Sequence, residues 1–223
     1  RQVSGPLERR YRLKGLHMGK KVAVLAVQGA FIEHERALSK LGCECAELRQ
    51  GPDVRQPFDA IVLPGGESTV QAKLLRELGM LDKLRRRIAE GMPVLGTCAG
   101  LILLAQTVEE GIPKAGDPAA EVVGGDVAPG AFGTLPVTVR RNAYGRQLGS
   151  FHTEAPFSSI EGDVPMTFIR APYIANVHEG ATPLATVDER IVAVRAENQI
   201  GVAFHPELDN DLRIHERFVK MIG

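Results

Sequence analysis

Residues 91–104 read Gly91-Met92-Pro93-Val94-Leu95-Gly96-Thr97-Cys98-Ala99-Gly100-Leu101-Ile102-Leu103-Leu104, and this stretch decides the fold. A short apolar run leads into small residues with one thiol at their centre, and a second apolar run follows. This is the layout of a G-x-C-x-G nucleophile elbow, in which a strand delivers a cysteine to a tight turn before a helix. Gly96 and Gly100 leave room for a strained backbone at Cys98. The alternative is a buried structural cysteine in a glycine-rich turn.

The composition is that of one globular domain. The chain has 223 residues, of which 44% are hydrophobic and 24% charged. It holds neither an apolar run long enough to cross a bilayer nor a signal-peptide pattern, so we expect no membrane association. We predict that residues 1–17, which hold five basic residues and one acidic, are an added leader before a domain at 18–223. Without them 22 basic face 26 acidic residues, which argues against a nucleic-acid partner.

The cysteines indicate the compartment. Cys43, Cys45 and Cys98 are an odd number with no disulfide-scaffold spacing, so we predict a reducing, cytoplasmic location. Cys43 and Cys45 form a C-x-C that no further cysteine or close histidine pair completes. We therefore interpret both as structural and predict no metal site.

Strands and helices alternate along the first half of the chain. Strands are predicted at 21–27, 44–48 and 58–63, with helices at 31–41 and 81–90. After a long loop at 109–133 the pattern becomes rich in strands, and the predicted elements are strands at 135–140, 167–171, 191–195 and 200–204 and a closing helix at 209–222. The predicted fold is α/β: a single three-layer domain whose mostly parallel central sheet is flanked by helices, with an antiparallel extension in the C-terminal half.

Three polar segments each follow a buried strand directly: Gln28, the loop Pro64-Gly65-Gly66-Glu67-Ser68-Thr69, and Cys98. Ligands of open α/β sheets gather at the carboxyl ends of the strands, so we expect these segments at one sheet edge. Gly65 and Gly66 let the backbone approach a ligand, and Ser68 or Thr69 is expected to cap the next helix. A plain glycine-rich turn is the alternative for this loop.

A cysteine nucleophile needs a base and a group that orients the base. His205 follows an apolar run and lies in His205-Pro206-Glu207, where Glu207 can accept the imidazole N–H. A surface His–Glu pair is the alternative. The other histidines are weaker candidates: His34 and His215 are expected to face solvent on charged helices, and His152 and His178 lie in loop-like surroundings.

These motifs resemble those of the triad-type (class I) glutamine amidotransferases, and most nearly the glutaminase subunits of pyridoxal 5′-phosphate synthases. The matching segments are 25–31, 63–69, 96–102, 139–147, 168–172 and 204–208, in the family's order. Two segments depart from the pattern: 109–133 is longer and richer in Gly and Pro, and His152-Thr153-Glu154 stands where an acidic residue is expected after Phe151.

The resemblance implies hydrolysis of glutamine to glutamate and ammonia through a thioester. It makes Cys98 the nucleophile, His205 the base and Glu207 the group that orients it, and it implies no cofactor. The residues that it assigns to glutamine binding are Gly65, Gly66, Glu67, Arg141, Ile169 and Arg170. Either Arg141 or Arg170 suits the substrate carboxylate. The backbone N–H groups of Ala99 and of Gly66 or its neighbour are the candidate oxyanion donors.

The resemblance also implies a partner, because ammonia released into water would be protonated and lost. The partner is the synthase subunit, in a hetero-oligomeric complex, and Gln28 is placed to sense its docking. Two alternatives remain. One is another enzyme of the same fold, either the glutaminase subunit of a different synthase (such as imidazole glycerol phosphate synthase) or a γ-glutamyl hydrolase, and the other is a non-catalytic regulatory protein on this scaffold. Arg141-Asn142 and Ile169-Arg170 favour the first assignment, and an intact Cys98 argues against a dead site.

Overall fold

The computed structural model describes residues 19–109, 127–128, 130–141 and 150–223. The predicted leader at 1–17 and most of the predicted loop at 109–133 lie outside these ranges. The helices are α2 (Phe31–Lys40), α3 (Ser68–Glu77), α4 (Leu81–Ala89), α5 (Ala99–Leu104) and α6 (Arg213–Val219), with 3-10 turns η1 (Gly51–Arg55) and η2 (Pro206–Leu208). No helix in the described part of the chain is long and apolar enough to cross a membrane.

The described strands form one large sheet and one hairpin. They are β1 (Lys21–Leu25), β2 (Glu44–Leu48), β3 (Ala60–Leu63), β4 (Val94–Thr97), β5 (Ala105–Glu109), β6 (Val127–Ala128), β7 (Leu135–Arg140), β8 (Ser150–Pro156), β9 (Asp163–Ile169), β10 (Tyr173–Val177), β11 (Thr182–Val187), β12 (Arg190–Ala196) and β13 (Gln199–Val202). The large sheet has the order β2-β1-β3-β4-β13-β12-β10-β7-β5-β6, and β11 pairs with β12. The hairpin is β8–β9.

The sheet changes character at β13. From β2 to β13 neighbouring strands are parallel, with Leu95 of β4 opposite Val62 of β3 and Ile200 of β13. Beyond β13, the pairs β13–β12, β12–β10 and β10–β7 are antiparallel. The predicted parallel sheet with an antiparallel extension in the C-terminal half is therefore confirmed.

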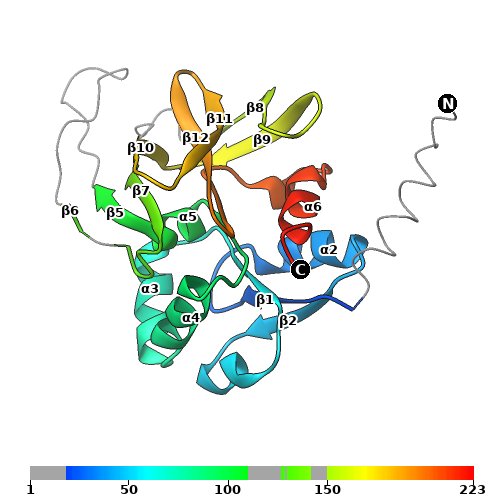
Figure 1. Cartoon of the computed structure of the whole chain (residues 1–223), viewed down its shortest axis with the longest axis vertical. Coiled ribbons are helices and arrows are strands. Elements are labelled where there is room, and N and C mark those ends of the chain that lie inside the picture. Colours follow the sequence, from blue (N-terminus) through cyan, green and yellow to red (C-terminus); the bar gives the residue numbers. More distant parts are fainter. Residues whose placement is uncertain (1–18, 110–126, 129, 142–149) are drawn as a thin grey trace, which may run out of the picture.

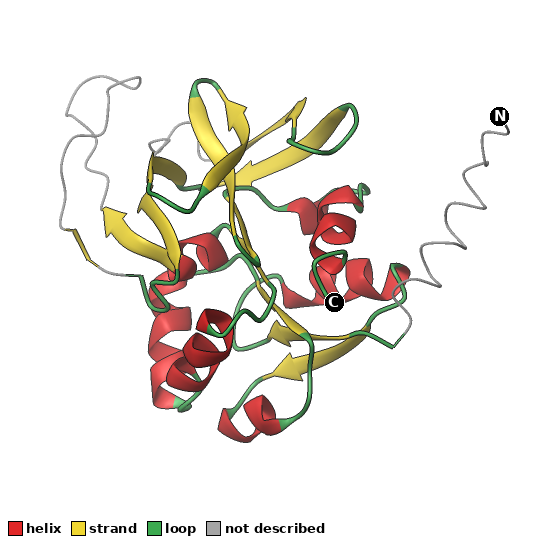
Figure 2. Ribbon diagram, in the orientation of Figure 1, coloured by secondary structure: helices red, strands yellow, loops and turns green. Residues whose placement is uncertain are grey.

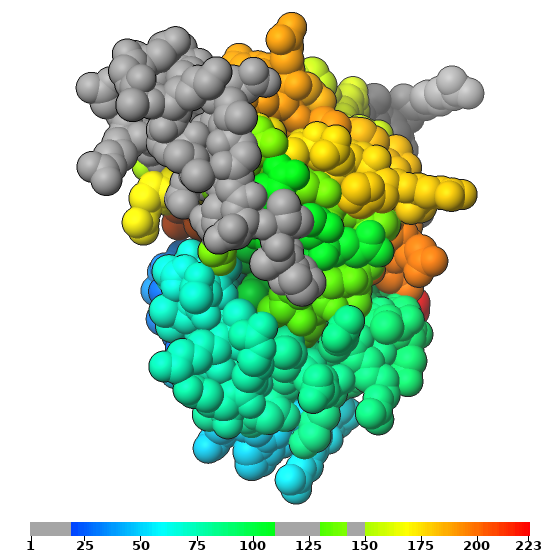
Figure 3. Space-filling model, turned by 90° about the vertical axis from the view of Figure 1, so that its left-hand side faces the viewer, coloured from blue at the N-terminus to red at the C-terminus, as the bar shows by residue number. Residues whose placement is uncertain are grey.

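Helices cover the parallel half on both faces, which gives the three layers. Figure 1 places α2 and α6 on one side of β1 and β2, and α3, α4 and α5 on the other. The same arrangement is visible by element type in Figure 2. From the side, α3 and α4 form the lower part of one face, in shades of cyan and teal, below the later strands in lime to orange (Figure 3).

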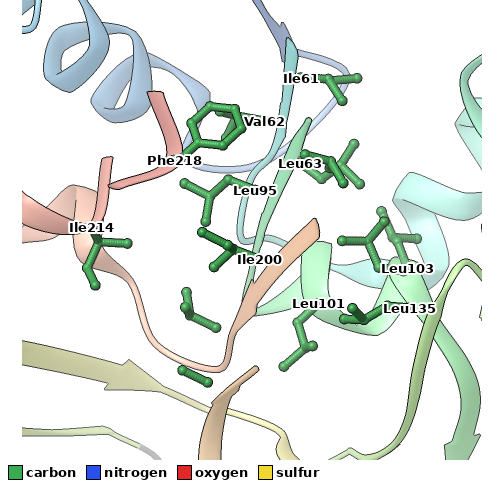
Figure 4. Close-up of a cluster of buried hydrophobic side chains, with 14 of the residues drawn as sticks. Ile61, Val62, Leu63, Leu95, Leu101, Leu103, Leu135, Ile200, Ile214 and Phe218 are labelled. Carbon is green, nitrogen blue, oxygen red and sulfur yellow. The ribbon is translucent and has the colours of Figure 1, made fainter. Parts of the chain in front are cut away.

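The core explains why the central strands read as continuous apolar runs. Every residue of β3, β4 and β13 is buried, as expected of strands covered on both faces. Figure 4 shows the two sides: Phe218 of α6 lies near Val62 and Leu95, whereas Leu101 and Leu103 of α5 lie on the opposite side. These contacts fix the ends of β4 and β13, where Cys98 and His205 follow.

The C-terminal half differs from the prediction in its details. The strands β8, β10 and β11 were not predicted, and β8 pairs with β9 in a separate hairpin instead of extending the large sheet. Only one of the seven residues of β8 is buried, so the strand lacks the apolar run that marks buried strands. The closing helix begins at Arg213 instead of residue 209, because the Asp211 carboxylate accepts the Arg213 N–H at 2.9 Å in a local turn.

The expectation that His34 and His215 face solvent is wrong. Both are fully buried, His34 on α2 and His215 on α6, and their rings are joined by a 2.9 Å contact between Nδ1 of His34 and Nε2 of His215. His34 shares a buried helix face with Ala37 and Leu38, at a spacing of three and four residues. Burial lowers the pKa of His215 to about 4. Burial, followed by the charges of His215 and His205, holds the pKa of His34 well below its ordinary value.

Gly100 lies against the backbone of β3, and replacing it by alanine tests this packing. A Cβ at Gly100 would lie 2.0 Å from the Leu63 carbonyl oxygen, so we expect Gly100→Ala to lower the free energy of unfolding by roughly 2–3 kcal/mol, despite the better helix propensity of alanine. Gly180→Ala is the control: it meets no atom within 4 Å, so only its φ of +91° resists, at a cost of about 1 kcal/mol. Urea unfolding measures both, and equal losses would contradict the close packing of α5 on β3.

The buried histidines predict a loss of stability in acid. Between pH 6.5 and about 4, His215 is protonated in the unfolded chain but neutral in the folded chain. The free energy of unfolding should therefore fall with decreasing pH, by about 1.4 kcal/mol per pH unit for each such histidine. His215→Gln removes one of these groups but keeps a donor, so its curve, measured by urea unfolding, should be shallower over this range. Parallel curves for the two proteins would rule out this source of acid sensitivity.

Candidate active site

Cys98 occupies the predicted elbow, between the end of β4 and the start of α5. Its backbone has φ 48° and ψ −100°, a left-handed conformation that non-glycine residues rarely adopt and that tends to mark functional sites. The Cys98 N–H donates to the Val202 carbonyl at 2.8 Å, and the Cys98 carbonyl accepts from Ile102 at 3.3 Å. The turn is thus tied to β13 on one side and to α5 on the other. Ala99, a candidate oxyanion donor, is the first residue of α5.

His205 follows β13 and its side chain is almost completely buried. Its Nδ1 lies 2.8 Å from Oε1 of Glu207, and its backbone N–H donates to the Thr167 carbonyl of β9 at 2.8 Å. Pro206 begins the short turn η2, which brings the Glu207 carboxylate back towards the imidazole. The structure therefore shows a buried His205–Glu207 pair, and the surface-pair alternative does not hold.

The proton affinity of His205 results from opposing effects. Burial lowers its pKa, whereas the hydrogen bonds with Cys98 and Glu207 and their negative charges raise it, with a net pKa of about 10. The imidazole therefore holds its proton at neutral pH when it faces these two acidic groups. Cys98, His205 and Glu207 thus form one coupled set. The Cys98 thiol also lies 3.9 Å from the carbonyl oxygen of Ile169, at the end of β9.

The glycine loop lies directly against this set. A Cβ at Gly65 would come within 2.3 Å of Cε1 of His205, and a Cβ at Gly66 within 2.4 Å of Oε1 of Gln28. The same Gln28 oxygen accepts the backbone N–H of Glu67 at 2.8 Å. The predicted meeting of Gln28, the glycine loop and the elbow at one sheet edge is therefore observed.

The cap of α3 differs from the prediction. Glu67, and not Ser68 or Thr69, is the N-cap, and its carboxylate accepts from the N–H groups of Thr69 at 3.0 Å and Val70 at 2.8 Å. Burial opposes ionisation, but these bonds and the charge of Arg141 lower the pKa of Glu67. The hydroxyls of Ser68 and Thr69 instead accept from the Arg141 guanidinium.

The remaining predicted binding residues lie at the same edge. Arg141 comes from the end of β7, and its guanidinium contacts Ser68 and Thr69 at the start of α3. Ile169 offers its carbonyl to Cys98, and 37% of its surface is exposed. Arg170 follows it with an exposed side chain and a φ of 44°. Arg141 thus contacts the residues directly after the glycine loop, and Arg170 follows the residue whose carbonyl lies near the thiol.

The other candidate residues are accounted for by local contacts. Burial raises the pKa of Cys43 and of Cys45 to about 11, as expected of inert thiols. His152 contacts the Thr167 hydroxyl and His178 the Thr138 hydroxyl, each at 3.0 Å.

His34 lies next to Glu207 and contacts Thr97 and His215, and these three residues were not predicted as part of the site. Nε2 of His34 lies 3.3 Å from Oε2 of Glu207 and 3.2 Å from Oγ1 of Thr97. The spacing of His34 with Ala37 and Leu38 was the signal in the sequence, because it puts His34 on the apolar face of its helix.

Comparisons with known proteins agree with this geometry. The model of the SNO glutamine amidotransferase family matches residues 24–223. The pyridoxal 5′-phosphate synthase subunit PdxT of Desulfitobacterium hafniense (strain Y51) is 57% identical over 203 residues, which cover 91% of this chain and 94% of that protein. PdxT of Haemophilus influenzae (strain PittEE) is 46% identical over 202 residues, which cover 89% of this chain and 96% of that protein.

A solved structure is similar over nearly the same span. A crystal structure described as a glutamine amidotransferase matches with a TM-score of 0.77 and 38% identity, over 91% of this chain and 98% of that one. The residues matched by the family model include the elbow, the glycine loop and the histidine segment. The chain belongs to the SNO glutamine amidotransferase family.

Proposed function

We propose that this protein is the glutaminase subunit of a pyridoxal 5′-phosphate synthase. It hydrolyses L-glutamine to L-glutamate and ammonia and delivers the ammonia to the synthase subunit. The observation that carries the proposal is the coupled set of Cys98, His205 and Glu207 at the edge where the glycine loop ends. The names of the relatives, PdxT subunits of this synthase, favour it over another synthase or a γ-glutamyl hydrolase.

In the first half of the reaction, the proton of the Cys98 thiol already lies on His205, and the thiolate sulfur attacks the carboxamide carbon. The high proton affinity of His205 favours this ion pair, and Glu207 keeps the imidazole oriented through Nδ1. The C–N bond then breaks as His205 gives its proton to the leaving nitrogen. Ammonia and a glutamyl thioester on Cys98 are formed.

In the second half, His205 takes a proton from water, and the resulting hydroxide attacks the thioester carbonyl. The C–S bond breaks, glutamate is released, and the proton on His205 restores the resting pair with Cys98. Both tetrahedral intermediates carry a negative oxygen that needs preorganised donors. The N–H of Ala99, directly after the nucleophile, is one proposed donor, and an N–H of Gly66 or its neighbour is the other.

Glutamine is proposed to bind between the glycine loop and the two arginines. Gly65, Gly66 and Glu67 provide a backbone surface next to His205, and Ile169 borders Cys98. A guanidinium binds a carboxylate through two parallel hydrogen bonds, so Arg141 or Arg170 is assigned to the α-carboxylate of the substrate. In this state the Arg141 guanidinium contacts Ser68 and Thr69, which holds it at the loop.

Gln28 is proposed to make the site respond to the synthase subunit. Its side-chain oxygen takes the N–H of Glu67, the neighbour of Gly66, and its backbone carbonyl accepts from Gln71 at 3.0 Å. As long as Gln28 holds this N–H, the loop cannot offer it to an oxyanion. Docking that moves Gln28 would complete the oxyanion site only when the ammonia has a recipient.

The protein is proposed to work in the cytoplasm. All three cysteines are free, and two of them are inert thiols in the core or next to it, which suits a reducing compartment.

The experiment is a glutaminase assay with and without the synthase subunit. We expect the isolated chain to be slow and the subunit to raise its rate by roughly 10²-fold or more, the usual effect of one oxyanion donor. In the complex, Cys98→Ala should lose about 10⁴-fold or more in kcat. Cys45→Ala, which changes a partly buried thiol away from the elbow, is the matched control and should keep its rate.

Two results would contradict the proposal. Full turnover by the isolated chain, unchanged by the synthase subunit, would exclude the role of Gln28. Glutaminase activity that survives in Cys98→Ala and is lost in Cys45→Ala would exclude Cys98 as the nucleophile.

A further inference from the structure

A second pair of histidines lies behind the proposed catalytic set. His34 comes from α2 and His215 from α6, two helices that are 181 residues apart at this contact, and both side chains are fully buried. Their rings meet through Nδ1 of His34 and Nε2 of His215 at 2.9 Å. Burying two imidazoles in a core costs free energy that an apolar pair of the same size would not. The burial of these two imidazoles therefore needs a functional explanation.

The other nitrogen of His34 points at the proposed triad. Its Nε2 lies 3.3 Å from Oε2 of Glu207, the carboxylate oxygen that His205 does not use, and 3.2 Å from Oγ1 of Thr97. That Glu207 oxygen is buried and has no hydrogen bond of good geometry among the described residues. His34 Nε2 is thus placed between the carboxylate and the residue that precedes the nucleophile.

The carboxylate decides which tautomer His34 adopts. If Nε2 carries the proton, it offers a donor to the two oxygens within reach, Oγ1 of Thr97 at 3.2 Å and Oε2 of Glu207 at 3.3 Å. Nδ1 then accepts the N–H of His215, and His215 Nδ1 keeps an unpartnered lone pair but no unpartnered N–H. If Nδ1 carries the proton, a lone pair faces the carboxylate and His215 buries an unpaired N–H. The second arrangement points a lone pair at a negatively charged carboxylate and leaves the His215 N–H without an acceptor. The first arrangement is therefore favoured.

We propose that His34, with its tautomer fixed by His215, is a positioning residue that presents an N–H to Glu207 and thereby holds that carboxylate aimed at His205. The proposal rests on the proposed function. It extends the set Cys98–His205–Glu207 by two buried residues, His34 and His215. Thr97 links the same nitrogen to the elbow, so His34 also couples the carboxylate to the strand that carries the nucleophile.

The charge state of the pair supports this role. The titratable groups that face His34 are His215 from α6, Glu207 from η2 and His205 before it. Burial keeps both His34 and His215 neutral at pH 7, so the pair adds a dipole and not a second positive charge. A neutral donor stabilises the carboxylate without competing with the His205 imidazolium for it.

The test replaces His34 in the complex with the synthase subunit. His34→Leu removes the donor at similar volume, and we expect kcat for glutamine to fall roughly 10- to 100-fold with little change in KM. The pH profile of kcat should change as well, because the variant lacks the donor that helps to orient the His205–Glu207 pair. His34→Gln, which can still place an N–H near Glu207, should recover most of the rate. His34→Asn is too short to do so and should resemble His34→Leu.

A second readout does not depend on turnover. In the isolated chain, NMR titration of the His205 imidazole should give a pKa of about 10. This pKa should fall clearly in His34→Leu and less in His34→Gln. Folded His34→Leu protein with unchanged kcat profile and unchanged His205 titration would overturn the proposal. If His34→Leu does not fold, equal kcat values and equal titrations for His34→Gln and His34→Asn would overturn it. A natural complex without glutaminase activity would instead reject the proposed function and leave the titration to decide this inference.

Discussion

The backbone turn at Cys98 is the constraint on which the rest of the site depends. A left-handed conformation at a non-glycine residue costs about 1–3 kcal/mol and persists only where its surroundings enforce it. Here β4 is paired on both sides, with β3 and β13, and α5 packs so closely on β3 that Gly100 has no room for a side chain. The parallel sheet and the short helix therefore hold the thiol at one point of the sheet edge.

The same parallel pairing supplies the partners of the thiol. Because β13 lies next to β4, the chain that leaves β13 brings His205 to the elbow, and η2 turns Glu207 back onto it. The loop after β3, the other neighbour of β4, brings Gly65 against the imidazole. Three adjacent strands thus deliver nucleophile, base and loop, and the polar cluster around Glu207 joins them to α2 and α6.

The sequence predicted the elements whose signal is local. The elbow, the glycine loop and the His205-Pro206-Glu207 segment could each be found from neighbouring residues, and the apolar runs located the parallel strands along the chain. The strand β8 was not predicted because its side chains are mostly exposed. Glu67 was not predicted as the cap of α3 because Ser and Thr are more usual caps. His34 and His215 were misplaced because charged neighbours surround them and because their pairing joins residues far apart in the chain.

The central claim is that the sulfur of Cys98 attacks glutamine. The most direct measurement is acid quenching of the working complex with glutamine, followed by mass spectrometry of peptides from this chain. We expect a glutamyl group on the peptide that contains Cys98, present during turnover and lost when glutamine is exhausted. A glutamyl group on Cys43 or Cys45, or ammonia production with no covalent species on Cys98, would contradict it.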